Sequence, residues 1–301
     1  MKKYALTSAV MFASMALVPF TASAATVYLQ SSQTKVSVGD IIVVSAKIDS
    51  DSAIINSVDG EISLSSPVDG TAVQEFSLGG SSFGLWPRTP SLSADGRVIS
   101  FVGGVPGGFN FQGATLFSIV LEAKKEGTIT LSPRNLSAFL NDGKGTKAPV
   151  QLKSLSIQVG PHAASEPVRD DWKAIVSADT QAPEDFVVVL GQDSTLFDGK
   201  KFAFFSAVDN QSGVAYYEVS ENDGPAVRSG STYVLQQQDA DPELRVTAYD
   251  KAGNKKVSGY PDASTGGTNW LFIIIVVIVI AAIWYIVRKM RAKKNSSPYQ
   301  Q

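Results

Sequence analysis

The side chains that could support catalysis are few and scattered. His162 is the only histidine and the chain has no cysteine, so a Ser-His-Asp triad has one candidate base and a zinc site has too few ligands. Three aspartate pairs could in principle support glycoside hydrolysis, but they lie in turn-like segments where Asp is common: Asp49 with Asp51, Asp170 with Asp171, and Asp239 with Asp241. These residues predict a protein that is not an enzyme.

Calcium is the metal for which the loops offer ligands. The segments AVDNQSG and YDKAGN place four hard oxygen donors in loops: Asp209, Asn210, Asp250 and Asn254. No twelve-residue EF-hand loop is present, and Asx turns explain the same residues. We therefore expect no cofactor, and structural calcium stays an alternative.

The segment GGVPGGFNFQG, residues 103–113, is rich in glycine. A phosphate-binding loop needs a Lys and a following helix, whereas this segment has no Lys and precedes ATLFSIVLEA, which has the pattern of a strand. A nucleotide site is therefore excluded. We predict instead a bend between two strands, where positive φ and close backbone approach favour glycine.

Four aromatic residues lie in irregular segments around these glycines: Phe83, Trp86, Phe109 and Phe111. Exposed aromatics in loops are platforms for sugars or hot spots for protein partners. The alternative is that they close the ends of a hydrophobic core. We take all four as candidate ligand-binding residues and keep the core alternative open.

The elements that would position these residues are β-strands. Short runs rich in Val, Ile, Thr and Phe, such as DIIVVSAKI and VQLKSLSIQV, alternate with turn residues, which is typical of a sandwich or barrel. Asp-Gly pairs, a signal for hairpin turns, recur at 59–60, 69–70, 95–96, 142–143, 198–199 and 223–224. We predict a sandwich over 25–159, a linker over 160–180 and a smaller sandwich over 181–259, with no helix in these regions.

The two ends of the chain predict export and anchoring. Residues 1–24 have the basic start, apolar run and Ala-x-Ala site of a signal peptide. Residues 270–287 form an uncharged apolar run of eighteen residues, about 27 Å of helix, close to the hydrocarbon thickness of a bilayer. Trp270, Trp284 and Tyr285 suit the two interfaces. A flexible stalk, 260–269, connects this span to the second sandwich.

Charge sets the orientation and excludes one class of partner. The tail, 288–301, begins with basic residues, including Arg288 and Lys289, which predicts a cytoplasmic C-terminus. Without the two lysines of the signal peptide and the five basic residues of the tail, the exported part has 19 basic and 28 acidic residues, a net charge of about −9. This balance disfavours nucleic acid. We expect a single-pass protein of the cell membrane with its β modules outside the cytoplasm.

The order of motifs in the first sandwich resembles the cohesin module. Val38-Gly39-Asp40 leads a long strand, and Asn56 to Gly60, Asp95 to Gly108, Leu116 to Ala123 and Asn141 to Thr146 follow in the family's order, with Leu121 where the pattern has Phe. The match covers about 26–159. It implies a jelly-roll β-sandwich, related to certain carbohydrate-binding modules, that recognises a dockerin or a polysaccharide without catalysis.

The second sandwich resembles bacterial surface immunoglobulin-like modules in DTQAPEDF, DNQSGVAYYEV and VTAYDKAGN. The resemblance implies a spacer that raises the first module above the membrane. Together these features predict a bacterial cell-surface recognition protein whose partner is an extracellular dockerin-like protein or a polysaccharide. The alternatives are a carbohydrate-binding module acting in polysaccharide capture and catabolism, and a structural envelope or adhesion protein.

Overall fold

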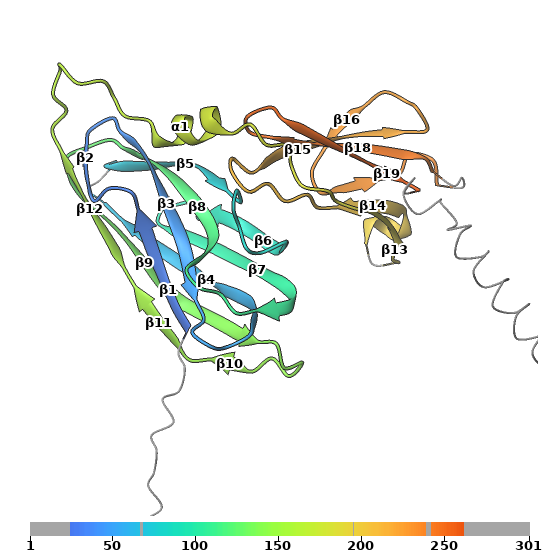
Figure 1. The fold of residues 1–301 in the computed structure, drawn as a ribbon, viewed down its shortest axis with the longest axis horizontal. Helices are drawn as coiled ribbons and strands as arrows, with labels where there is room; N and C mark the ends of the chain where they lie inside the picture. The colour runs from blue at the N-terminus through green and yellow to red at the C-terminus, as the bar shows by residue number, and fades with distance from the viewer. Residues whose placement is uncertain (1–24, 67–68, 195, 239–241, 262–301) are drawn as a thin grey trace, which may run out of the picture.

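The chain forms two β modules, which a computed structural model describes over residues 25–66, 69–194, 196–238 and 242–261 (Figure 1). We call residues 25–160 the head and residues 181–260 the second module. Among the described residues, no helix has the length and apolar character needed to cross a bilayer. The predicted signal peptide, span 270–287 and tail lie outside the described residues, as does nearly all of the stalk.

The head consists of two sheets. Sheet A has the order β11-β1-β3-β8-β5. Its strands are β1 (Ala25–Ser31), β3 (Ile41–Asp49), β5 (Thr71–Ser77), β8 (Ala114–Ala123) and β11 (Val150–Lys153). The pairing of β1 with β11 is parallel and the other pairs are antiparallel.

Sheet B has the order β2-β12-β9-β4-β7-β6, and β10 pairs with β9. Its strands are β2 (Lys35–Ser37), β4 (Ile55–Ser65), β6 (Leu85–Leu92), β7 (Val98–Phe109), β9 (Gly127–Leu140), β10 (Lys147–Ala148) and β12 (Leu155–Gly160). The two sheets confirm the predicted β-sandwich for this part of the chain.

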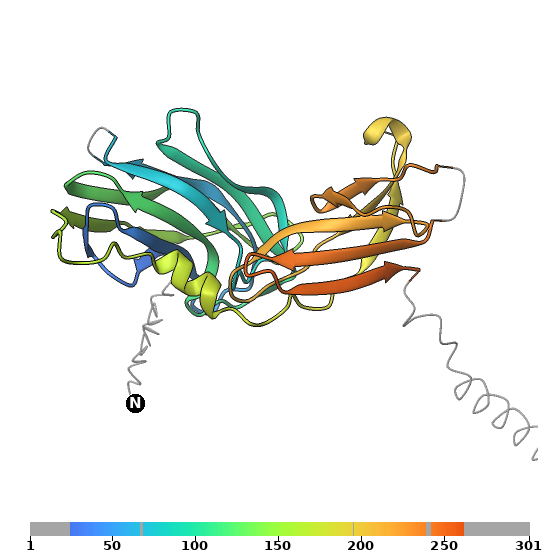
Figure 2. The same cartoon turned by 90° about the horizontal axis from the view of Figure 1, so that it is seen from above.

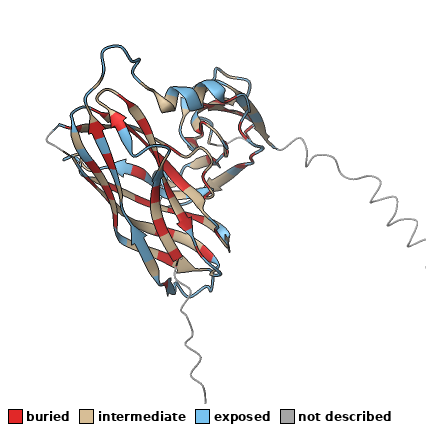
Figure 3. Cartoon of the chain, turned by 60° about the vertical axis from the view of Figure 1, so that its left-hand side comes forward, coloured by how far each residue is buried: buried red, intermediate tan, exposed pale blue. Residues whose placement is uncertain are grey.

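Alternating side chains build the core between the sheets. In β3, Ile42, Val44, Ala46 and Ile48 are fully buried, whereas the residues between them are partly exposed. The same alternation of buried and exposed positions runs along other strands (Figure 3). It follows from the two-residue repeat of a strand, which directs successive side chains to opposite faces. The repeat in the sequence therefore determines which face of each sheet is left to solvent.

The glycines of the head do not all form turns. Gly103 and Gly104 lie within β7, and a Cβ on Gly103 would be 2.7 Å from both the Phe83 and Trp86 rings. Gly107 and Gly108 have the positive φ expected, and they lie where the β7 ladder is interrupted, between Gly104, which pairs with Ser57, and Phe109, which pairs with Ile55. The predicted bend is therefore an irregularity inside β7 and not a connection between two strands. A Cβ on Gly107 would meet nothing within 4 Å, so its positive φ, and not close packing, favours glycine there.

One of the predicted Asp-Gly turns is also wrong. Asp59-Gly60 lies in the middle of β4, where a Cβ on Gly60 would be 2.9 Å from Leu136. A bulge in β9, with Asn135 at positive φ, places Leu136 in the space that Gly60 leaves. The pair therefore serves packing between strands and not a hairpin.

The second module also has two sheets, of orders β13-β14-β17 and β16-β15-β18-β19. The strands are β13 (Val188–Gln192), β14 (Lys201–Phe205), β15 (Val214–Glu221), β16 (Val227–Ser229), β17 (Thr232–Val234), β18 (Leu244–Asp250) and β19 (Lys255–Tyr260), with a 3₁₀ turn η1 (Phe197–Gly199). Phe205, Val219, Val246 and Ala248 are fully buried in its own core. The module is therefore a separate hydrophobic unit.

The linker contains a helix that the sequence did not predict, α1 (Asp171–Ala178). The Asp170 carboxylate accepts the N–H of Lys173 at 2.8 Å and caps the first turn. The helix lies along sheet A, near β3 (Figure 2). It is held there because the N–H of Ile41 donates to the carbonyl of Arg169, and the N–H of Arg169 donates to the carboxylate of Asp40.

The two modules are in direct contact. The Ser77 hydroxyl donates to the carbonyl of Ser212 at 2.8 Å, and the N–H of Gly80 donates to the carbonyl of Asp209 at 3.0 Å. Lys251 of the second module pairs with Glu75 of the head at 2.5 Å. Because these contacts join segments more than 125 residues apart, they fix the second module against one end of the head.

Candidate functional site

The four aromatic candidates divide into two groups. Phe83 and Phe111 are 2% and 1% exposed, and their rings meet edge to face with centroids 5.5 Å apart. Trp86 is partly buried against this pair, and its indole N–H donates to the Phe83 carbonyl at 3.1 Å. Phe109 is 60% exposed. Phe83 and Phe111 therefore belong to the hydrophobic core, as the alternative prediction had it. Phe109 and one part of Trp86 are accessible to a ligand.

The predicted carboxylate pairs have local partners. The Asp49 carboxylate accepts the N–H of Asp51, which has a positive φ, so this pair forms a turn. Asp170 caps α1, and Asp171 pairs with Arg169. The third pair, Asp239 with Asp241, lies outside the described residues.

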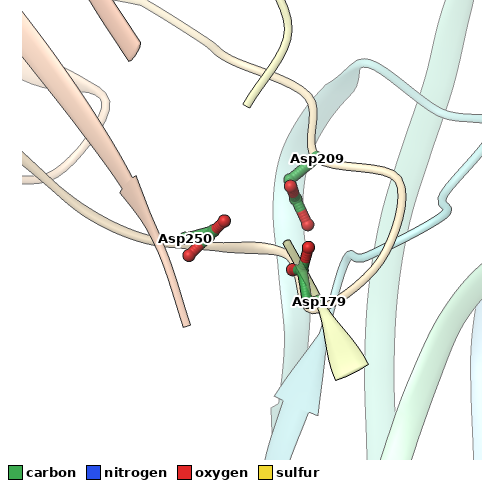
Figure 4. A group of neighbouring side chains, drawn as sticks. All are labelled: Asp179, Asp209 and Asp250. Atoms are coloured by element: carbon green, nitrogen blue, oxygen red, sulfur yellow. The ribbon is translucent and has the colours of Figure 1, made fainter. Parts of the chain in front are cut away.

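Three aspartates meet where the linker enters the second module (Figure 4). Asp179, Asp209 and Asp250 are 5%, 3% and 2% exposed, and one carboxylate oxygen of each lies within 4.8 Å of the others. The sequence pointed to Asp209 and Asp250. It missed Asp179, which lies in the linker outside the two quoted loops.

Hydrogen bonds from the protein occupy these carboxylates. Asp209 accepts the N–H groups of Gln211 and Gly213, and Asp179 accepts the N–H and hydroxyl of Ser212. Asp250 accepts both the backbone and the side-chain N–H of Asn254. Burial raises the pKa of Asp209, and the nearby aspartate charges raise it too, although its hydrogen bonds oppose the increase.

The other candidate calcium ligands do not offer oxygen to this cluster. The side-chain amide of Asn210 donates to Glu184, and that of Asn254 donates to Asp250 at 2.8 Å. For Asp179, burial raises the pKa, but the bonds from Ser212 and Gln181 lower it by more, so its pKa lies below the ordinary value. Three carboxylates are donors that calcium accepts. In this cluster, however, they serve as hydrogen-bond acceptors that connect the linker to two loops.

The outer face of sheet B is the broadest accessible surface of the head. Along β9, β4 and β7, residues that point outward alternate with residues buried in the core. Most of the outward residues are polar, and two are valines. They are Asp59, Glu61, Ser63, Val98, Ser100, Val102, Thr130, Ser132 and Arg134. We call this set the open face. Among the described elements, the extensive contacts of these three strands are with other strands of the head.

A charged pair lies in the middle of the open face. Arg134 Nε is 3.1 Å from Glu61 Oε2, and the Asn135 amide donates to the same oxygen at 3.1 Å. Glu61 is opposite both Ser100 and Arg134 in the register. Both charged side chains are about a third to a half exposed. An exposed ion pair contributes little to stability, so these groups are available for recognition.

The solved structures that are similar to this chain include several cohesin modules. No family model and no curated protein matches the chain. A non-cellulosomal cohesin from Archaeoglobus fulgidus has a TM-score of 0.36 and 14% identity over 46% of this chain and 91% of its own. The seventh ScaB type I cohesin from Pseudobacteroides cellulosolvens has a TM-score of 0.38 and 18% identity over 48% and 97%.

A third similar structure is the cohesin of a type I cohesin–dockerin complex from Clostridium thermocellum, with a TM-score of 0.37 and 16% identity over 45% of this chain and 99% of its own. The similarity thus extends over less than half of the chain. Since these identities are below 25% and the TM-scores below 0.5, the proposals that follow depend on the residues and contacts of this chain.

Proposed function

We propose that the head binds an extracellular protein partner of the dockerin type through the open face, without catalysis. The second module serves as a spacer, and residues 270–287 anchor the chain in the cell membrane. One observation carries the proposal: the open face is a broad, mixed polar and apolar surface on which no other described element packs extensively. The order of cohesin-like motifs in the sequence supports the same partner class.

The size of the open face suits a protein. β4, the middle strand of the open face, has eleven residues, which gives about 37 Å at about 3.4 Å per residue. Sheet B continues beyond the open face into β12 and β6, and these five neighbouring strands, at about 4.8 Å each, add about 24 Å. The product is about 900 Å², close to the roughly 800 Å² that each partner buries in a standard interface.

The aromatic residues favour a protein over a neutral polysaccharide on this face. A glycan-binding sheet presents a row of exposed aromatic rings, whereas the outward aromatics described on β9, β4 and β7 are Phe139, beside Lys147, and Phe109. Phe101 of β7 points into the core and is 1% exposed. Phe109 lies at the end of β7 and is separated from Phe139 by β4. The face therefore lacks the row that a sugar chain would follow.

Binding of a dockerin panel to the full-length chain tests the proposal. The panel includes the dockerin of the Clostridium thermocellum complex, and affinity is measured by biolayer interferometry. Ser100→Arg places a long cation in the middle of the open face without touching the core. The matched control is Gln30→Arg, an exposed outward position on sheet A with the same added charge.

We expect Ser100→Arg to weaken dockerin binding by tenfold or more, because a long side chain at the centre of the interface prevents close packing of the partner. Gln30→Arg should bind within twofold of the unchanged chain. Equal binding by both variants would show that the open face is not the contact surface. If the chain bound neutral glycans and none of the dockerins, the ligand of the head would be a polysaccharide and not a protein.

The membrane anchor is tested separately. After expression with its signal peptide in a bacterial host, the chain should stay in the membrane pellet during carbonate extraction, and a protease added outside should digest the β modules and spare the tail. Deletion of 270–301 should release the modules. Extraction of the chain by carbonate would contradict the proposed membrane anchor. It would not bear on the proposal that the open face binds a partner.

A further inference from the structure

A cleft of about 550 Å³ separates the head from the second module. Leu85, Trp86 and Thr89, in the first part of β6, line it from the head. Residues of β14, β15 and β16 line it from the other side. The volume lies in the range of about 300–1,000 Å³ that small-ligand sites occupy, and such sites are frequent at domain boundaries.

The walls of this cleft are held in place by the junction between the modules. Ser77 bonds to Ser212 and Gly80 to Asp209, and Lys251 pairs with Glu75 while its ammonium lies 4.9 Å from the Trp172 ring centroid. These contacts join the same two modules that form the cleft. A ligand would therefore meet a preformed site and would not need to order the two modules on binding.

Apolar and aromatic groups from both modules face the cleft. Leu85 of the head is 44% exposed and Phe204 of the second module is 40% exposed, and both line it. Tyr216 lines it as well and stacks on Tyr249, with ring centroids 4.8 Å apart and an angle of 15° between the planes. Leu85 and Phe204 thus offer exposed apolar surface that can receive the C–H face of a sugar ring, whereas the Tyr216 ring is covered by Tyr249 and by Arg228.

One cation faces the cleft. The guanidinium of Arg228 lies 3.9 Å from the centroid of the Tyr216 ring, and Arg228 forms no ion pair with the residues that the structure describes. Glu218 is opposite Arg228 in the pairing of β15 with β16, and its carboxylate accepts a hydrogen bond from the Tyr249 hydroxyl. The one carboxylate among the lining residues, Asp209, is 3% exposed and accepts N–H groups of its own loop.

We propose that this cleft binds an acidic carbohydrate, an oligosaccharide of uronic acid residues. A sugar ring packs against the aromatic and apolar wall, and its carboxylate pairs with the fork of Arg228, which is preorganised by its stacking on Tyr216. Because the exported part of the chain is net acidic, an unpaired arginine beside aromatic rings gives the cleft a local selectivity for anions.

An extended peptide suits this wall less well. Peptides that add to a sheet edge need free N–H donors along it, and the edge strand β6 contains Pro87 and Pro90, which have none. The serine hydroxyls on the opposite wall, from Ser206 and Ser231, are suited to sugar hydroxyls. Both features favour the carbohydrate.

Isothermal titration of the full-length chain with tetragalacturonate tests the site, with maltotetraose and poly-glutamate as the neutral and peptide probes. Arg228→Gln removes the charge, and Arg228→Lys retains it without the planar fork. Arg245→Gln is the matched control, since Arg245 is an exposed arginine on β18 that does not line the cleft. Arg228 is exposed, so neither variant disturbs a core.

We expect tetragalacturonate to bind, Arg228→Gln to weaken it by about tenfold or more, Arg228→Lys to weaken it less, and Arg245→Gln to leave it unchanged. Maltotetraose should bind at least tenfold more weakly. The proposal is overturned by an absence of tetragalacturonate binding, by equal binding of the Arg228→Gln variant, or by preference for poly-glutamate. Ser100→Arg should not change sugar binding, which separates this site from the open face.

Discussion

The junction between the modules depends on the absence of a side chain at Gly79. A Cβ at this position would overlap the carbonyl oxygen of Gln211 and lie 2.8 Å from the backbone N of Gly213, whereas ordinary contact begins at 3.4 Å. Both neighbours are backbone atoms and cannot rotate away. The contact with the Gln211 oxygen is the tighter of the two, so Gly79→Ala must separate the two loops by about 1 Å.

The cost of this separation follows from the hydrogen bonds that cross it. The bonds from Ser77 to Ser212 and from Gly80 to Asp209 would lengthen beyond useful geometry, at about 1 kcal/mol each. Ser77 and Ser212 are 1% and 0% exposed, so the atoms left without partners add a desolvation cost. The total is about 2–4 kcal/mol, which reduces the docked population relative to the undocked one by about 30-fold to 1,000-fold.

Spin-label distances measure this change directly. The chain has no cysteine, so Thr128→Cys on the head and Lys255→Cys on the second module label two exposed sites specifically. Pulsed electron double resonance should give one narrow distance distribution for the parent and a broad one after Gly79→Ala. The control is Gly84→Ala in the same connection, where a Cβ meets nothing within 4 Å.

A narrow distribution for Gly79→Ala, equal to that of Gly84→Ala, would refute the reasoning. It would mean that the close approach at Gly79 does not hold the modules together. A broad distribution in the parent chain would refute the docked arrangement itself.

Three further predictions concern stability. Gly60→Ala should destabilise the head by about 1–3 kcal/mol in urea unfolding, because its Cβ would be 2.9 Å from Leu136, whereas Gly84→Ala should not. Asp209→Asn keeps an oxygen for the N–H groups of Gly213 and Gln211. Burial raises the pKa of Asp209, so the favourable contribution of its protonated form is present below the ordinary value of 3.8 and is lost as the pH increases through the raised pKa. The parent should therefore lose stability relative to the variant as the pH increases from 3.8 through the raised pKa. Removal of calcium with EDTA should leave the unfolding midpoint of the second module unchanged, because protein donors already serve the three aspartates; a lower midpoint would show that a structural cation binds there.

The architecture of the head could be predicted from the sequence because apolar residues there recur at every second position along a strand. In β3 every second residue is apolar, and the structure buries those residues between two sheets. Turns were predicted well where Asp-Gly lies between strands: Gly96 and Gly143 have positive φ. The rule failed at Gly60, because a contact with Leu136, 76 residues away, decides that position.

The features that the sequence could not predict depend on contacts across long separations. Helix α1 has a clear N-cap in Asp170, but its eight residues lack a buried position, so its apolar pattern was weak. Asp179 joins Asp209 and Asp250 only when the linker enters the second module. The cleft requires both modules, and no local pattern places Trp86 near Arg228.

Docking of the second module gives the open face a fixed direction relative to the end of the chain. Asp250, at one end of β18, lies at the junction, and Leu244, at the other end, pairs with Tyr260, beyond which the predicted stalk begins. The seven residues of β18 span about 20 Å. If residues 270–287 span the membrane, the two docked modules form one stiff arm, and the predicted stalk, 260–269, is the flexible point at its base. A stiff arm limits the orientations that the open face can adopt, and this lowers the entropy lost when a partner binds. Gly79→Ala should therefore weaken binding to a surface-held dockerin more than binding to a soluble one, and equal weakening would contradict the role of the arm.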